Sequence, residues 1–70
     1  MTDLRDDILS AFQPHAKGHI DKHRMNVEVY LTNPVGVGEH PDIMEAIETE
    51  MEQIAKYDDM LEMVEKYFSE

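Results

Sequence analysis

The chain has 70 residues, of which 16 are acidic and six are basic, and its net charge at neutral pH is −10. A chain of this length forms one small domain, and such domains bury too little apolar surface to be comfortably stable alone. The absence of cysteine excludes disulfide bonds and thiolate metal sites and fits a reducing compartment. Oligomerisation or a structural metal is left as the source of additional stability.

The charge and the hydropathy pattern exclude several classes of partner. Phosphate contacts need clustered Lys and Arg, so the strong negative charge opposes binding to nucleic acid or to anionic membranes. No apolar run approaches the roughly 20 residues of a membrane span, and the start MTDLRDDI lacks the features of a signal peptide. We therefore expect a cytoplasmic protein. Residues 1–35 carry a net charge of −1 and residues 36–70 one of −9. Lys17, Lys22 and Arg24 lie beside the histidines of the first half, so protonated histidines would make that stretch cationic and able to attract the acidic second half.

The first half predicts a helix that begins near residue 3, with Thr2 as its N-cap and acidic residues in its first turn. Pro14 lies inside this pattern and should kink or break the helix, although the apolar spacing stays in phase across it. Residues 25–31 also alternate as a strand would, but the chain offers no second strand to pair with, so we favour helix. The helical stripe consists of Leu4, Ile8, Ala11, Phe12, Ala16, Ile20, Val27, Tyr30 and Leu31.

The segment NPVGVGEHP predicts the turn, with Asn33 as a left-handed cap and Pro34, Gly36, Gly38 and Pro41 as turn residues. Pro41 at a first helical position, with His40 beside it, marks the start of the second helix. One apolar face then continues for about seven turns. Its members are Ile43, Met44, Ile47, Met51, Ile54, Ala55, Leu61, Val64 and Phe68.

These elements predict an all-α helical hairpin that fills residues 1–70 as a single domain. Two helices that touch along one seam leave much of each apolar stripe exposed, so we expect two hairpins to pair as a homodimeric antiparallel four-helix bundle. A turn centred near residue 37 places side chains of opposite charge across the seam. The expected neighbours are Lys22 with Glu52, Arg24 with Glu50, and His15 with Asp58 and Asp59.

His15, His19 and His23 recur at every fourth residue and form a ladder on one face of the first helix. His15 and His23 are about 12 Å apart along the helix axis, so all three cannot bind one ion. The pair His15 and His19, with Asp58 and Glu62 opposite, is the better candidate for a divalent metal site. The alternatives are rings that cover the edge of the apolar stripe and pair with the acidic helix, or a pH switch.

Side chains off the main stripe of the second helix suggest a further apolar flank that faces a partner, formed by Tyr57, Met60, Met63 and Tyr67. No pair of nucleophile and base stands out, so an enzyme is not expected. The favoured function is a non-enzymatic protein-interaction or assembly module. A metal-binding bundle is the second hypothesis, and an acidic surface that imitates nucleic acid is the third.

Residues 15–68, and most distinctively NPVGVGEHPDIMEAIE, resemble small uncharacterised proteins of marine cyanobacterial myoviruses and marine viral sequences. This resemblance implies a viral protein that acts in the cytoplasm of the infected host or within the virion. It brings no activity or site residues to this sequence.

Overall fold

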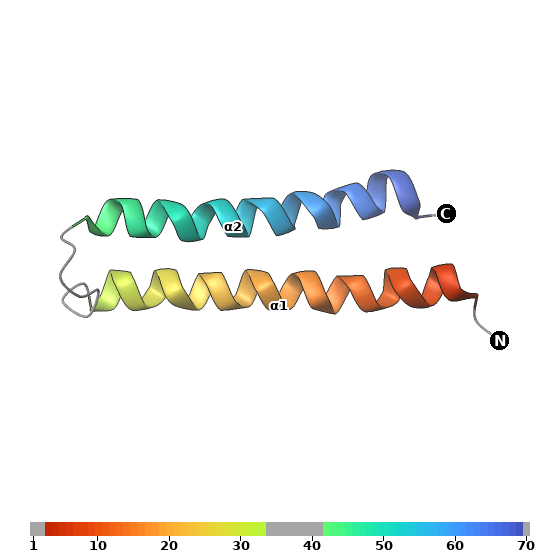
Figure 1. Cartoon of the computed structure of the whole chain (residues 1–70), viewed down its shortest axis with the longest axis horizontal. Helices are drawn as coiled ribbons and strands as arrows, with labels where there is room; N and C mark the ends of the chain where they lie inside the picture. Colours follow the sequence, from red (N-terminus) through yellow and green to blue (C-terminus); the bar gives the residue numbers. More distant parts are fainter. Residues whose placement is uncertain (1–2, 34–41, 70) are drawn as a thin grey trace.

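The computed structural model describes residues 3–33 and 42–69, which form an antiparallel helical hairpin (Figure 1). Helix α1 spans Leu4–Thr32 and helix α2 spans Ile43–Met63, and a π-helical turn, η2, continues α2 over Val64–Phe68. The prediction of an all-α hairpin is confirmed, and so is helix at residues 25–31. The expected turn residues Pro34, Gly36, Gly38 and Pro41, together with His40 and Thr2, lie outside the described residues.

An aspartate is the N-cap of each helix. The Asp3 carboxylate accepts a hydrogen bond from the Arg5 N–H at 2.9 Å, and the Asp42 carboxylate accepts one from the Glu45 N–H at 2.9 Å. These bonds satisfy backbone donors that a helix start leaves without partners. The N-cap of α1 is thus Asp3, one residue later than expected. The start of α2 is later than expected too, because Asp42 caps it and Ile43 is its first residue.

The end of α1 differs from the expectation of a left-handed cap. Asn33 has φ of −145° and ψ of 69°, and its backbone N–H donates to the Val29 carbonyl at 2.8 Å. That bond already satisfies a terminal carbonyl of the helix, so a left-handed residue is not needed there.

Pro14 lies inside α1, which continues through it without a break (Figure 1), so the predicted alternative of a broken helix is wrong. Proline removes the hydrogen bond that would reach back to the carbonyl of Ser10. Both Pro14 and Ser10 are exposed, so water can satisfy that carbonyl and the helix tolerates the loss.

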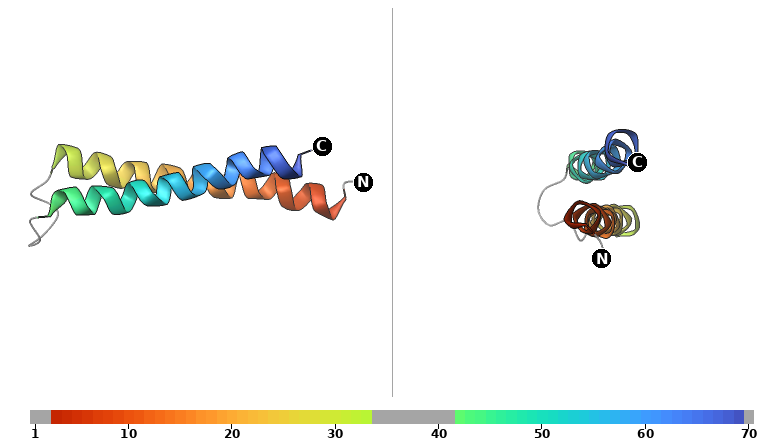
Figure 2. Two further views of the ribbon diagram at one scale, coloured as in Figure 1. Left: turned by 90° about the horizontal axis from the view of Figure 1, so that it is seen from above. Right: turned by 90° about the vertical axis from the view of Figure 1, so that its right-hand side faces the viewer.

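The contact between the helices follows a heptad pattern, in which side chains three and four positions apart face the partner helix. The helices cross at a shallow angle (Figure 2). Ala16 is fully buried and the other seam side chains are half-buried. The seam of α1 comprises Leu9, Phe12, Ala16, His19, His23, Asn26 and Tyr30, and that of α2 comprises Ile43, Ala46, Glu50, Gln53, Tyr57, Met60 and Val64.

The seam of α2 is rotated away from the centre of the predicted apolar stripe. Glu50 and Tyr57 face α1, whereas Met44 and Met51, which the pattern placed in the stripe, are 71% and 56% exposed. Ile47 and Ile54 lie half-buried between these two sets. One edge of the apolar stripe therefore remains open to solvent after the hairpin has formed.

The molecule is an open rod. Its radius of gyration is 16.0 Å, whereas a compact domain of this length has about 11 Å. Its accessible surface is 5709 Å², whereas a compact monomer of 8.2 kDa exposes about 4,500 Å². Within the described ranges, neither helix is long and apolar enough to cross a membrane. The hairpin thus exposes more surface to water than a compact monomer of the same mass.

Gly18 provides a test of the helix interior. A Cβ atom added there meets nothing within 4 Å, so Gly18→Ala should stabilise α1 by about 0.5–1 kcal/mol through reduced chain entropy. Thermal unfolding followed by circular dichroism should show a melting temperature several degrees higher. The opposite change at exposed Ala55, Ala55→Gly, should lower it by a similar amount. A lower melting temperature for Gly18→Ala would mean that this position is packed.

Candidate functional site

A polar cluster lies in the seam between α1 and α2, in the half nearer the loop end. His23 Nδ1 lies 2.6 Å from Glu50 Oε1, and the Asn26 side-chain amide donates to the same oxygen at 2.8 Å. An ionised carboxylate only accepts hydrogen bonds, so His23 is the donor in the first contact. The side chains of His23 and Glu50 are 12% and 15% exposed. Two donors from one helix thus converge on a single carboxylate of the other.

The hydrogen bonds from His23 and then Asn26 lower the pKa of Glu50 below its ordinary value of 4.5, and burial opposes this shift. Hydrogen bonds to the charged form outweigh the loss of hydration here. Glu50 is therefore ionised at neutral pH although it lies in the helix seam. Its charge is satisfied only while α1 keeps its present alignment with α2.

The histidine ladder forms a column of rings beside this cluster. The ring centroids of His15 and His19 are 4.8 Å apart, and those of His19 and His23 are 6.5 Å apart. Phe12 extends the column, with its centroid 5.8 Å from that of His15. From α2, the Tyr57 ring stacks on His19 at 4.4 Å with an interplanar angle of 3°. His19 is thus a packing residue of the seam.

The surroundings of His19 disfavour its protonated form. Desolvation lowers its pKa below 6.5, and the positive charges of His15, Lys22, His23 and Lys56 lower it further, in that order. Lys56 also lies over the ring of Tyr57, with Nζ 5.3 Å from the centroid. A charge gained by His19 would have to be accommodated between an aromatic ring and several cations.

The four predicted metal-ligating residues do not form a compact group. His19 stacks on Tyr57, while His15, Asp58 and Glu62 are exposed. Within residues 3–33 and 42–69, no cluster of three or more His, Asp or Glu side chains could hold a metal ion. The metal site therefore stays a prediction from spacing, with no formed ligand cluster to support it.

The four residues expected to face a partner divide into two pairs. Tyr57 and Met60 are half-buried in the seam, because the helix contact is rotated toward them. Met63 and Tyr67 are exposed, at 52% and 64%. The expectation that all four lie on one separate flank is therefore corrected, and only Met63 and Tyr67 remain open to a partner.

The expected pairing of Arg24 with Glu50 is also corrected. Arg24 lies 3.8 Å from Asp21 of its own helix, and both side chains are about 70% exposed. Glu50 uses His23 and Asn26 instead. Asn26 was absent from the predicted sites because an isolated Asn carries no chemical signature. The heptad spacing from Phe12 through His19 is the signal that could have placed Asn26 in the seam.

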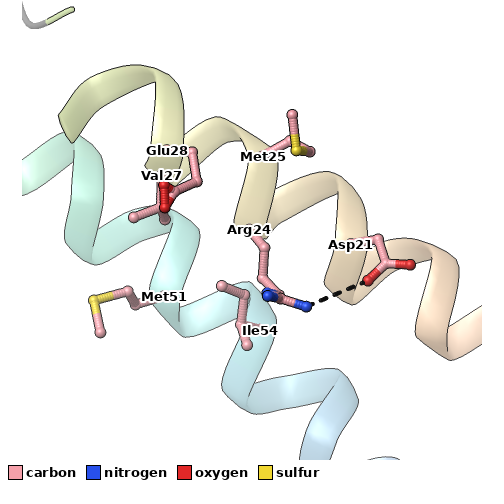
Figure 3. A pocket seen from close by; sticks show the side chains of 7 residues that line it. All are labelled: Asp21, Arg24, Met25, Val27, Glu28, Met51 and Ile54. Atoms are coloured by element: carbon pink, nitrogen blue, oxygen red, sulfur yellow. Dashed lines mark ion pairs between the residues drawn. The ribbon is translucent and has the colours of Figure 1, made fainter. Parts of the chain in front are cut away.

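Two apolar surfaces border the seam. At the open end of the hairpin, Arg5 Nη2 donates to the Phe68 carbonyl at 2.6 Å. The apolar groove beside this bond is lined by Ile8, Leu9, Phe12, Met60, Met63, Val64 and Phe68. Toward the loop end, Figure 3 shows Val27, Met51 and Ile54 around a second depression that Arg24 borders.

Comparison of the chain with protein-family models, curated proteins and solved structures finds no match. The assignment of a role therefore depends on the geometry of the hairpin.

Removing the Glu50 carboxylate should weaken the hairpin. In Glu50→Ala, His23 and Asn26 lose their shared acceptor in the seam, which should cost about 1–3 kcal/mol of unfolding free energy. Urea denaturation at pH 7 measures this loss. Glu48→Ala is the matched control, because Glu48 is exposed and its removal should change stability by less than about 0.5 kcal/mol. Equal effects of the two variants would contradict a structural role for the cluster.

His19 should make stability depend on pH. Because its folded pKa lies below 6.5, the unfolded chain binds more protons, and stability falls as the pH drops from about 6.5 toward the folded pKa. Glu50 adds a separate loss below about pH 4.5, since its folded pKa is also lowered. Urea midpoints measured from pH 7.5 to 3.5 should therefore fall in two stages. His19→Gln should remove the loss of stability that begins near pH 6.5 and keep the loss below about pH 4.5. If the loss near pH 6.5 is unchanged in this variant, His19 is not its source.

Proposed function

We propose that this protein is a non-enzymatic assembly module that acts by pairing with a second copy to form a four-helix bundle. The observation that carries this proposal is the incomplete burial of apolar surface by the hairpin. Ala16 is the single fully buried residue among those described, and ten large apolar side chains are more than half exposed. A helical hairpin with such a surface gains stability when a second hairpin covers it.

The exposed area is sufficient for a stable interface. The chain exposes 5709 Å², about 1,200 Å² more than a compact monomer of the same mass. A specific interface of ordinary size removes roughly 600–1,000 Å² from each partner. Pairing with one copy can therefore account for most of the excess.

The polar cluster supports an architectural role. The Glu50 carboxylate and its two donors are engaged with each other across the seam, so they hold α1 and α2 together and leave no free reactive group there. A polar contact of this kind fixes the alignment of paired helices. The resemblance to cyanobacterial myovirus proteins adds an expected setting, the infected host's cytoplasm or the virion.

Self-association should be visible in solution. Sedimentation velocity at pH 7 should give the mass of two chains at high micromolar concentration, with dissociation on dilution. The melting temperature should rise with protein concentration, because pairing stabilises the folded state by mass action. A single-chain mass at every concentration, together with a melting temperature independent of concentration, would overturn the proposal.

A further inference from the structure

One flank of the hairpin carries a continuous apolar surface in the half nearer the loop end, here called the loop-half face. Figure 3 shows three of its members, Val27, Met51 and Ile54, in a depression that Asp21, Arg24, Met25 and Glu28 also line. Helical spacing places further apolar side chains on the same flank, on either side of these three along the helix axes. The face comprises Ile20, Val27, Leu31, Met44, Ile47, Met51 and Ile54.

Charged side chains border this flank on both helices. On α1, Lys17 and Arg24 are seven residues apart and therefore project to the same side, and both are exposed. Asp58 on α2 and Glu65 on η2 follow Met51 at the same interval and are also exposed. Lys17 and Glu65 line one depression, while Arg24 and Met51 line another, so both borders belong to one flank. Asp21 and Glu28 line the same depression as Arg24, and Asp21 lies 3.8 Å from Arg24, so Arg24 adds no net positive charge there. The flank thus carries Lys17 on its α1 side and the acidic Asp58 and Glu65 on its other side.

Two symmetric arrangements can bring this flank against its own copy. If the loop ends lie together, α1 lies beside the partner's α2, so Lys17 meets the Asp58 of the second copy and the apolar halves coincide. If the loop ends lie apart, α1 lies beside the partner's α1. Lys17 then meets its own copy, as does Asp58, and the apolar half faces the more polar half. Like charges in contact oppose an interface, and opposite charges favour one register over others.

We propose that two copies of this chain pair through the loop-half face with their loop ends together, so that each α1 lies beside the partner's α2. This inference rests on the proposed self-association and adds to it the face and the orientation. The second copy fits as occupant because in this orientation its own apolar half covers the loop-half face and its Asp58 meets Lys17.

A distance measurement tests the orientation. The chain lacks cysteine, so Thr32→Cys, at the exposed end of α1, provides a unique site for a spin label. With helix axes about 8–10 Å apart, loop ends together should give a label-to-label distance below about 30 Å by pulsed electron resonance. Loop ends apart would separate the labels by most of the 52 Å length of the rod. A long distance in a dimer of confirmed mass would overturn the proposed orientation.

A charge swap tests the two borders. Lys17→Glu and Asp58→Lys should each weaken the dimer by about three- to tenfold in Kd, as expected for exposed pairs that become repulsive. The double variant should recover most of the affinity, because the pair is restored with its signs exchanged. Lys22→Glu is the matched control, since it makes the same charge change away from this flank and should have a smaller effect.

The outcomes separate the two proposals. If no dimer forms, the proposed function fails. If a dimer forms with a long distance between the Thr32→Cys labels, the self-association stands and the orientation is wrong. If the distance is short but the double variant binds no better than the single ones, Lys17 and Asp58 do not determine the pairing.

Discussion

The hydrogen-bonded carboxylate of Glu50 is the constraint on which the rest of the hairpin depends. A charge in a helix seam is costly unless donors replace the water that it loses, and His23 and Asn26 supply both of them to one oxygen. A slip of one helix along the other by a single turn would separate this acceptor from its donors. Apolar side chains tolerate such a slip more readily, because dispersion and burial have little directional preference. The polar cluster therefore fixes the alignment.

The local structure could be predicted from the sequence, because it depends on near neighbours along the chain. Helical periodicity identified both arms, and Thr2 and Pro41 indicated where they begin. The N-cap of α1 is Asp3, one residue later than expected, and α2 begins at Ile43, two residues later. Pro14 shows where a local rule was too strict. Proline disfavours a helix interior, but the rule does not say whether the affected carbonyl faces water.

The candidate site could be predicted only in part, because the apolar stripe of α2 is wider than the helix contact. Periodicity gives the direction of the stripe, and a hairpin alone uses one edge of it. Which edge is used depends on side chains across the seam, such as the stacking of Tyr57 on His19. The pattern thus placed Met51 inside and Tyr57 outside, the reverse of what the structure shows. The π-helical turn at Val64–Phe68 has no counterpart in the periodic pattern at all.

The bond between Arg5 and the Phe68 carbonyl joins residues 63 positions apart in the chain. Contacts beside the loop close a far shorter segment, and the entropy lost on closure grows with its length. During folding, contacts between α1 and α2 should therefore form first near the loop end. The contact at the open end should be the last to form. By the same logic the open end should fray first, so local opening exposes the groove beside Phe68 before the Glu50 cluster is disturbed.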